Sequence, residues 1–266
     1  MMIDLHIHTE RCGHATGRPF EYVAEARRAG LAIVAFTDHL PLPDGYDPDE
    51  EYAMRPRELG EYVTEVREVA HSSGEAPRVL LGIEADWIPQ HRAYTASCIA
   101  SHAFDIVLGS VHFLDEWVFD DPRLIDEWSR RDVGDAWTQY FETLTQAASS
   151  GLFDVMAHPD LVKKFGHVPP GDLSALYDDV AGAIADAGVA IEVSSAGLRK
   201  PCREIYPSDE LLAAFCRAGV PVTTASDAHS PREVGRGLAE VRAAAARAGY
   251  TKIAYFEARE MREVAL

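Results

Sequence analysis

The stretch Asp4-Leu5-His6-Ile7-His8, near the amino terminus, decides how this chain is interpreted. In an extended strand successive side chains alternate between two faces, so His6 and His8 point the same way while Leu5 and Ile7 face an apolar layer. Two imidazoles on one face can bind one metal ion. The stretch therefore predicts a buried strand that carries two metal ligands at its end.

Other candidate ligands also stand where apolar runs end. The runs 33–36, 79–83, 106–108, 155–157 and 220–225 lead into Thr37-Asp38-His39, Glu84, Ser110-Val111-His112, His158-Pro159-Asp160 and Ser226-Asp227-Ala228-His229, respectively. One more histidine, His14, lies in the polar loop after the first strand. Ligand types at the same end of six successive strands indicate a functional site rather than isolated core histidines.

Predicted strands and helices alternate along the whole chain. Seven alternations, with a last short strand at 252–256, favour a closed (β/α) barrel over an open doubly wound sheet. Ser208 is predicted to cap one helix, and Ser230-Pro231-Arg232-Glu233 resembles the capping box of another. No composition break divides the chain, so we expect one domain over residues 1–266, with the active site at the carboxyl ends of the strands.

Two long loops lie beside the candidate ligands. Residues 41–56 contain four prolines and five acidic residues and are interpreted as a loop that could serve as a lid. Residues 115–132 mix Trp117, Phe119 and Trp128 with many charges. We interpret them as a surface segment that packs its aromatic rings on the barrel, in preference to a loop that contacts substrate.

The composition restricts the classes of partner. Acidic residues outnumber basic ones by 43 to 25, and the formal charge of −18 disfavours nucleic acid as a partner. No long apolar run and no signal sequence are present, so we expect a soluble, cytoplasmic protein without a membrane partner. Four cysteines without a CxxC pair are interpreted as reduced thiols, including Cys12 near the candidate ligands. The oligomeric state stays open.

The candidate ligands are too numerous for one ion. The nine residues are His6, His8, His14, His39, Glu84, His112, His158, Asp227 and His229. They imply two or three divalent ions, and a histidine-rich set suits Zn, Fe or Mn better than Mg or Ca. Glu84 is the natural bridging carboxylate. Clustered ions about 3.5 to 4 Å apart favour phosphoester hydrolysis without a protein nucleophile.

Together these motifs, in this order from residue 4 to residue 229, resemble the PHP (polymerase and histidinol phosphatase) family. The resemblance implies a distorted seven-stranded barrel with a trinuclear metal site. It would give His6, His8, Glu84 and Asp227 to the first ion. It would give Glu84, His112 and His158 to the second, and His14, His39 and His229 to the third.

Within this family the chain looks like the monofunctional histidinol-phosphate phosphatases. The supporting stretches are 158–166, 192–200 and Glu204-Ile205-Tyr206-Pro207-Ser208. This implies hydrolysis of L-histidinol phosphate, a small phosphorylated substrate. Arg199, with Lys163 or Lys164, would bind its phosphate, and Asp160 or His229 would assist the leaving alkoxide. The alternative is a PHP phosphoesterase acting on nucleotides or other small phosphorylated metabolites. Ser194, where this branch would have Asn, and the Lys163-Lys164 pair, where it commonly has Arg, are departures from its pattern.

Overall fold

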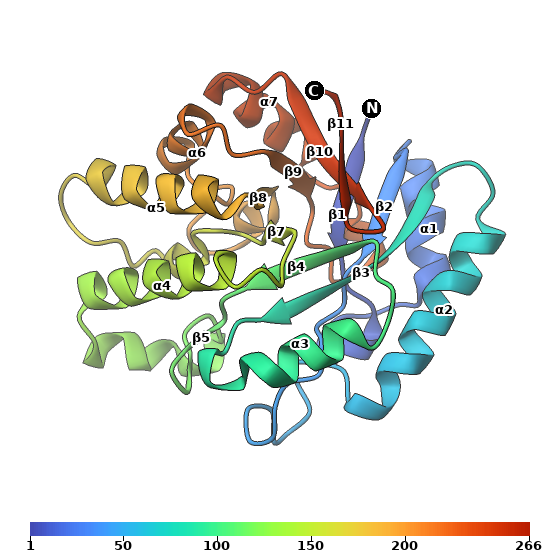
Figure 1. Ribbon diagram of the computed structural model, residues 1–266, viewed down its shortest axis with the longest axis horizontal. Helices are drawn as coiled ribbons and strands as arrows, with labels where there is room; N and C mark the ends of the chain where they lie inside the picture. The colour runs from blue at the N-terminus through green and yellow to red at the C-terminus, as the bar shows by residue number, and fades with distance from the viewer.

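Seven parallel strands follow one another in chain order around a barrel in the computed structural model, which describes residues 1–266 (Figure 1). Every neighbouring pair in this sheet is parallel. The strands are β1 (Ile3–Ile7), β2 (Ile33–Phe36), β3 (Arg78–Asp86), β4 (Ile106–Ser110), β7 (Val155–Met156), β8 (Ala190–Ser194) and β9 (Val222–Ala225). Their side chains are almost all buried, as expected where helices cover a parallel sheet.

The barrel is nearly closed between its first and last strands. The backbone N–H of His8 donates to the carbonyl of Ala228 over 2.9 Å, and the Thr224 hydroxyl donates to the carbonyl of Ile3 over 2.7 Å. The buried Asp4 carboxylate accepts bonds from the backbone N–H (2.8 Å) and hydroxyl (2.6 Å) of Ser226. The predicted distorted (β/α)7 barrel is therefore confirmed, and Asp4 joins its two end strands.

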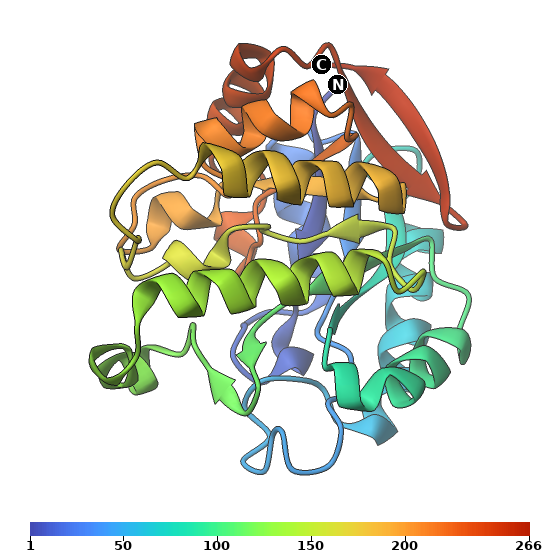
Figure 2. The same ribbon diagram turned by 60° about the vertical axis from the view of Figure 1, so that its left-hand side comes forward.

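Seven α-helices surround the sheet, and α4 and α5 run side by side in both views (Figure 2). Their apolar residues recur every three or four positions: in α4, Trp137, Tyr140, Phe141 and Leu144 are buried. The Asp132 side chain caps this helix by accepting from the N–H of Asp135. The helices are α1 (Pro19–Arg28), α2 (Leu59–Ser72), α3 (Arg92–Ala100), α4 (Val133–Ala148), α5 (Ser174–Ala187), α6 (Asp209–Arg217) and α7 (Leu238–Ala248).

The two cap predictions had different outcomes. Ser208 caps α6 by accepting from the N–H of Leu211, as predicted. The predicted capping box at 230–233 is wrong, because Pro231–Glu233 forms only one 3-10 turn and α7 begins five residues later. The Glu233 carboxylate does not fold back onto Ser230. It accepts from the N–H of His229 over 3.1 Å and pairs with Arg199.

The last short strand predicted at 252–256 is confirmed as β10. β10 (Lys252–Glu257) pairs antiparallel with β11 (Glu260–Ala265) in a two-stranded sheet of its own, outside the barrel. The two turn residues, Ala258 and Arg259, both have positive φ, which is the backbone of a tight hairpin turn. The two chain ends lie close together beside this hairpin (Figure 1). No helix in the structure has both the length and the apolar character needed to cross a membrane.

The two long loops meet at the same end of the barrel. The second loop, residues 115–132, follows β5 (Phe113–Leu114). It contains β6 (Trp117–Val118), which forms a hairpin with β5, and a 3-10 segment, Pro122–Arg130. Trp117, Phe119 and Trp128 are buried, so the predicted packing of the aromatic rings is confirmed. The first loop, residues 41–56, packs Leu42, Tyr46 and Tyr52 against an apolar cluster of Ile88, Phe113 and Val118.

Candidate metal centre

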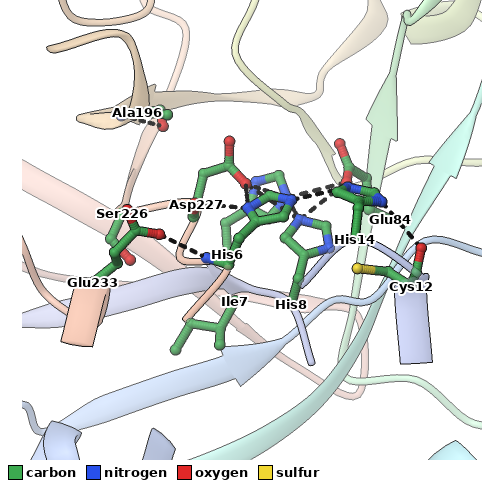
Figure 3. Close-up of polar contacts among 12 residues, drawn as sticks. His6, Ile7, His8, Cys12, His14, Glu84, Ala196, Ser226, Asp227 and Glu233 are labelled. Carbon is green, nitrogen blue, oxygen red and sulfur yellow. Dashed lines mark hydrogen bonds and ion pairs between the residues drawn. The ribbon is translucent and has the colours of Figure 1, made fainter. Parts of the chain in front are cut away.

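All nine predicted ligands lie at the carboxyl end of the barrel strands. His6 and His8 come from the end of β1, Glu84 from β3, and the others from the segments that follow β1, β2, β4, β7 and β9. Figure 3 shows His6, His8, His14, Glu84 and Asp227 gathered in one group. Several sets of three have ligand atoms close enough to share an ion: His6–Glu84–His158, His6–His8–Asp227, His8–His39–Glu84 and His14–His39–His229. The fold thus brings together residues up to 223 positions apart (229 − 6).

Glu84 stands in the middle of the group and is 1% exposed. Its Oε1 atom lies 3.0 Å from Nε2 of His158, and its Oε2 atom lies 3.1 Å from Nε2 of His6 and from Nδ1 of His39. Burial alone would raise the pKa of Glu84, but His39 and His6 hold it well below its ordinary value. A carboxylate that favours its ionised form and has both oxygens facing imidazoles is suited to bridge two cations.

His14 and His229 make a close nitrogen–nitrogen contact that a bound cation would relieve. Nδ1 of His14 has only carbonyl oxygens as partners, those of Cys12 and Glu51 at 3.0 Å, and must therefore carry its proton. Nδ1 of His229 likewise faces the carbonyl of Asp227 at 3.1 Å. The two Nε2 lone pairs then face each other at 3.1 Å. Two nitrogens bound to one tetrahedral Zn²⁺ lie about 3.3 Å apart, so the geometry fits a shared ion.

Two buried carboxylates orient histidines of the group, and neither was among the predicted site residues. Oε2 of Glu192, on β8, lies 2.7 Å from Nδ1 of His6, and Oδ1 of Asp86, on β3, lies 2.8 Å from Nδ1 of His112. Although burial lowers the pKa of His6, Glu192 raises it well above its ordinary value. With the proton fixed on Nδ1, the Nε2 atom of each ring faces Glu84, which is the arrangement of carboxylate–histidine–metal triads.

Replacing Glu192 by Gln is expected to weaken zinc binding by about 10- to 100-fold, because His6 loses the anion that fixes its tautomer and raises its basicity. Zinc competition with a chromophoric chelator measures this change. Glu240→Gln, at an exposed position of α7, is the control and should bind zinc like the wild type. Unchanged zinc affinity in Glu192→Gln would remove this orienting role.

Two of the candidate ligands have unusual backbone conformations. His158 has φ 29° and Asp227 has φ 51°, in the left-handed region that residues with a side chain rarely occupy. Such strain persists only where surrounding contacts hold it, and it concentrates at functional sites. It supports a functional role for both residues independently of their contacts.

Arg199 holds the segment that carries Asp227. Its Nη2 atom donates to the carbonyls of Ser226 (2.8 Å) and Asp227 (3.2 Å), and its Nε atom pairs with Glu233 at 3.2 Å. The Nη1 atom makes only one weak contact, at 3.5 Å to the carbonyl of Ser195. A phosphate contact by Arg199 would therefore use one arm of the guanidinium and not a bidentate fork.

The neighbouring lysines differ from each other. Lys163 is 2% exposed, and all three of its donors are used by Asp160 (2.8 Å), Glu204 (3.1 Å) and the carbonyl of Ile205 (2.9 Å). Lys164 binds only Asp120, through the carboxylate (2.9 Å) and the carbonyl (2.6 Å), which leaves one N–H free. The structure thus favours Lys164 over Lys163 as a phosphate ligand.

The Asp160 side chain makes no polar contact with the histidines of the candidate metal centre. Its carboxylate is fully buried and accepts from Lys163 and from the N–H of Ser208 at 2.7 Å, and no hydrogen bond or ion pair links it to a candidate ligand. The geometry favours a structural role for Asp160 over the acid role predicted from the sequence. Asp120, in the loop after β6, was not predicted individually. Against the effect of burial, Lys164 and His112 keep its pKa below the ordinary value.

The four cysteines are free thiols, as predicted. Cys12 is buried, and its sulfur lies close enough to His8 and His229 to form a further set of three potential ligands. Burial and the nearby Asp38 carboxylate raise the pKa of the Cys12 thiol. The neutral thiol is a poor ligand, which favours a structural role for Cys12 over metal binding.

A nearly closed seven-stranded barrel with buried histidines and carboxylates at the carboxyl ends of its strands defines the class of this protein. The PHP domain model matches residues 4–196, and a PHP-associated model matches residues 212–248. This chain belongs to the PHP domain family.

Several relatives carry more particular names. The chain is 40% identical over 239 residues to a probable histidinol-phosphatase of Deinococcus radiodurans, with 90% of each chain covered. It is 27% identical over 258 residues to the histidinol-phosphatase of Bacillus subtilis, covering 87% of this chain and 95% of that one. Its fold matches the crystal structure of a histidinol phosphate phosphatase from Lactococcus lactis, complexed with Zn, L-histidinol and phosphate. That match has a TM-score of 0.84 at 20% identity and covers 98% of both chains.

Proposed function

We propose that this protein is a metal-dependent phosphomonoesterase that hydrolyses L-histidinol phosphate to L-histidinol and phosphate, a step of histidine biosynthesis. The observation that carries the proposal is the 40% identity to the Deinococcus radiodurans relative over 90% of both chains. The histidine and carboxylate group supports the chemistry, because its ligand atoms, most of them buried, converge at the end of a barrel where active sites lie.

The residues fit divalent ions. We propose that His6, His8, Glu84 and Asp227 hold one ion, that Glu84, His112 and His158 hold a second, and that His14, His39 and His229 hold a third. Burial lowers the pKa of His8, and lowers those of His39 and His229 well below the ordinary value, which favours the neutral imidazole that ligates metals. Zn, Mn and Fe suit this donor set. Such ions acidify water and neutralise phosphoryl oxygens.

The residues around the group bind and orient the substrate. Lys164 offers its remaining N–H to a phosphoryl oxygen, and Asp120 keeps the ammonium in place from the other side. Arg199 contributes through Nη1 while its other donors hold the Asp227 segment. His229 stays a metal ligand in this proposal, because its Nε2 lone pair faces His14 and its proton is bound to Nδ1. Neither His229 nor Asp160 then protonates the leaving alkoxide.

Phosphate release from L-histidinol phosphate, AMP and an aryl phosphate tests the proposed substrate, with the protein loaded separately with Zn, Mn or Fe. We expect kcat/KM for L-histidinol phosphate to exceed that for the other two by at least about a hundredfold. Chelation of the metal should abolish turnover of all three. A broad or nucleotide-preferring profile would keep the phosphoesterase chemistry and overturn the substrate. The cytoplasmic location and the absence of a nucleic-acid partner remain predictions.

A further inference from the structure

We propose that Tyr52 and Arg123 are positioning residues for His14, and thereby control how tightly the third ion is held. The inference rests on the proposed metal centre but goes beyond it. Its basis is that His14, the most exposed of the proposed ligands, takes its orientation partly from a loop that is itself fixed by contacts to a second loop.

His14 is oriented by the loop 41–56. Its Nδ1 atom donates to the carbonyl oxygen of Glu51 at 3.0 Å, 37 residues away in sequence, as well as to that of Cys12. The backbone of this loop passes close to Gly13, the residue before His14. Gly13 has φ +86°, and a Cβ atom there would stand 3.1 Å from the carbonyl oxygen of Glu50 and 3.3 Å from that of Glu51. The absence of a side chain at position 13 is thus one condition for the Glu51 carbonyl to reach His14.

The Glu51 carbonyl is held by a compact turn. The Asp47 carboxylate accepts from the backbone N–H groups of Glu51 (2.8 Å), Tyr52 (3.0 Å) and Ala53 (3.1 Å). These three bonds fix successive peptide units relative to one another, so residues 47–53 behave as one piece. The position of this piece then decides where the Glu51 carbonyl lies.

A cluster of polar contacts, which we call the loop clamp, fixes this piece to the segment Pro122–Arg130. It consists of Glu51, Tyr52, Asp121 and Arg123. The Tyr52 hydroxyl donates to Oδ2 of Asp121 at 2.5 Å, and Nη2 of Arg123 donates to the Tyr52 hydroxyl at 2.9 Å. Arg123 also pairs with Asp121 at 2.7 Å and with the Glu51 carboxylate. The carbonyl that accepts from His14 belongs to the peptide group between Glu51 and Tyr52, and both of these residues are thereby joined to the second loop.

Three other proposed ligands have their Nδ1 atoms oriented without this loop. His6 and His112 are oriented by carboxylates on barrel strands, and Nδ1 of His229 bonds to a carbonyl two residues before it. Strand residues move less than surface loops. The ion held by His14, His39 and His229 should therefore be the first to leave when the loop clamp is broken, while the ions around Glu84 stay bound.

Zinc titration of Arg123→Ala and Tyr52→Phe tests the inference, with zinc stoichiometry measured after equilibration at fixed free zinc. We expect each variant to bind the weakest ion roughly tenfold less tightly, in the range found for residues that orient a ligand. The stronger ions should be unaffected, and higher free zinc should restore the lost one. Arg130→Ala is the matched control, because Arg130 lies in the same segment and pairs only with Glu127.

A double-mutant cycle identifies the ion. His14→Ala should lose the same ion, and adding Arg123→Ala to His14→Ala should then change zinc binding no further. Wild-type affinity for all ions in Arg123→Ala, an equal loss in Arg130→Ala, or additive losses in the double variant would each overturn the inference. A wild-type protein that binds no third zinc ion would overturn the metal assignment as well, so the two failures are distinguishable.

Discussion

Glu84→Gln is expected to lower kcat for L-histidinol phosphate by on the order of a thousandfold or more, corresponding to the loss of about 4 kcal/mol of transition-state stabilisation. The replacement keeps the shape of the side chain but removes its negative charge. In the wild type the two carboxylate oxygens lie within 4 Å of five histidine nitrogens. These nitrogens belong to His6, His8, His39, His112 and His158. With a neutral amide, two cations can no longer be bridged.

Steady-state kinetics together with the zinc content of the same sample check this prediction. Glu142→Gln, on the exposed face of α4, is the control and should keep full zinc content and turnover. If Glu84→Gln retains both wild-type zinc content and kcat, then Glu84 is not the bridging ligand.

Lys163→Met should destabilise the protein by about 3 to 5 kcal/mol, because it leaves the Asp160 carboxylate charged, buried and without its partner. Although burial lowers the pKa of Lys163, Asp160 raises it above the ordinary value, so the ammonium that pairs with Asp160 stays charged in the folded protein. Urea denaturation measures the free energy of unfolding. Adding Asp160→Asn to Lys163→Met should restore part of the loss, because no unpaired charge then remains.

Lys164→Met provides the comparison. Its side chain is bound only to Asp120, so we expect a small change in stability and an increase in KM for L-histidinol phosphate of about tenfold. If Lys163→Met instead raises KM and leaves the free energy of unfolding unchanged, the phosphate-binding role returns to Lys163.

The family and the barrel could be predicted from the sequence because their signals are local. The alternation around His6 and His8 and the position of Glu84 at the end of an apolar run both follow from strand geometry. A cap such as Ser208 is likewise decided by its immediate neighbours. The same reasoning failed for Glu233. Its carboxylate was predicted to bond to Ser230 in a capping box, but it accepts from the N–H of His229 and pairs with Arg199.

The contacts that orient the ligands could not be read from the sequence, because they join residues far apart. Glu192 meets His6 across 186 residues, and its only sequence signal is a charged residue within the apolar run 189–193. Asp86 had a clearer signal, since it lies two positions after Glu84 on the same face of β3. The assignment of Lys163 depended on whether its amine was already paired, which only the fold reveals.

The contact between the first and last barrel strands also bears on how the protein is made. His6 and His8 leave the ribosome well before Asp227 and His229, because 219 positions (227 − 8) separate the two pairs. The nascent chain therefore exposes its first metal-binding pair long before the rest of the centre exists. The backbone bond from His8 to Ala228 can form only after residue 228 has been synthesised. Assembly of the whole metal centre therefore cannot precede synthesis of the last barrel strand and of the residues that follow it.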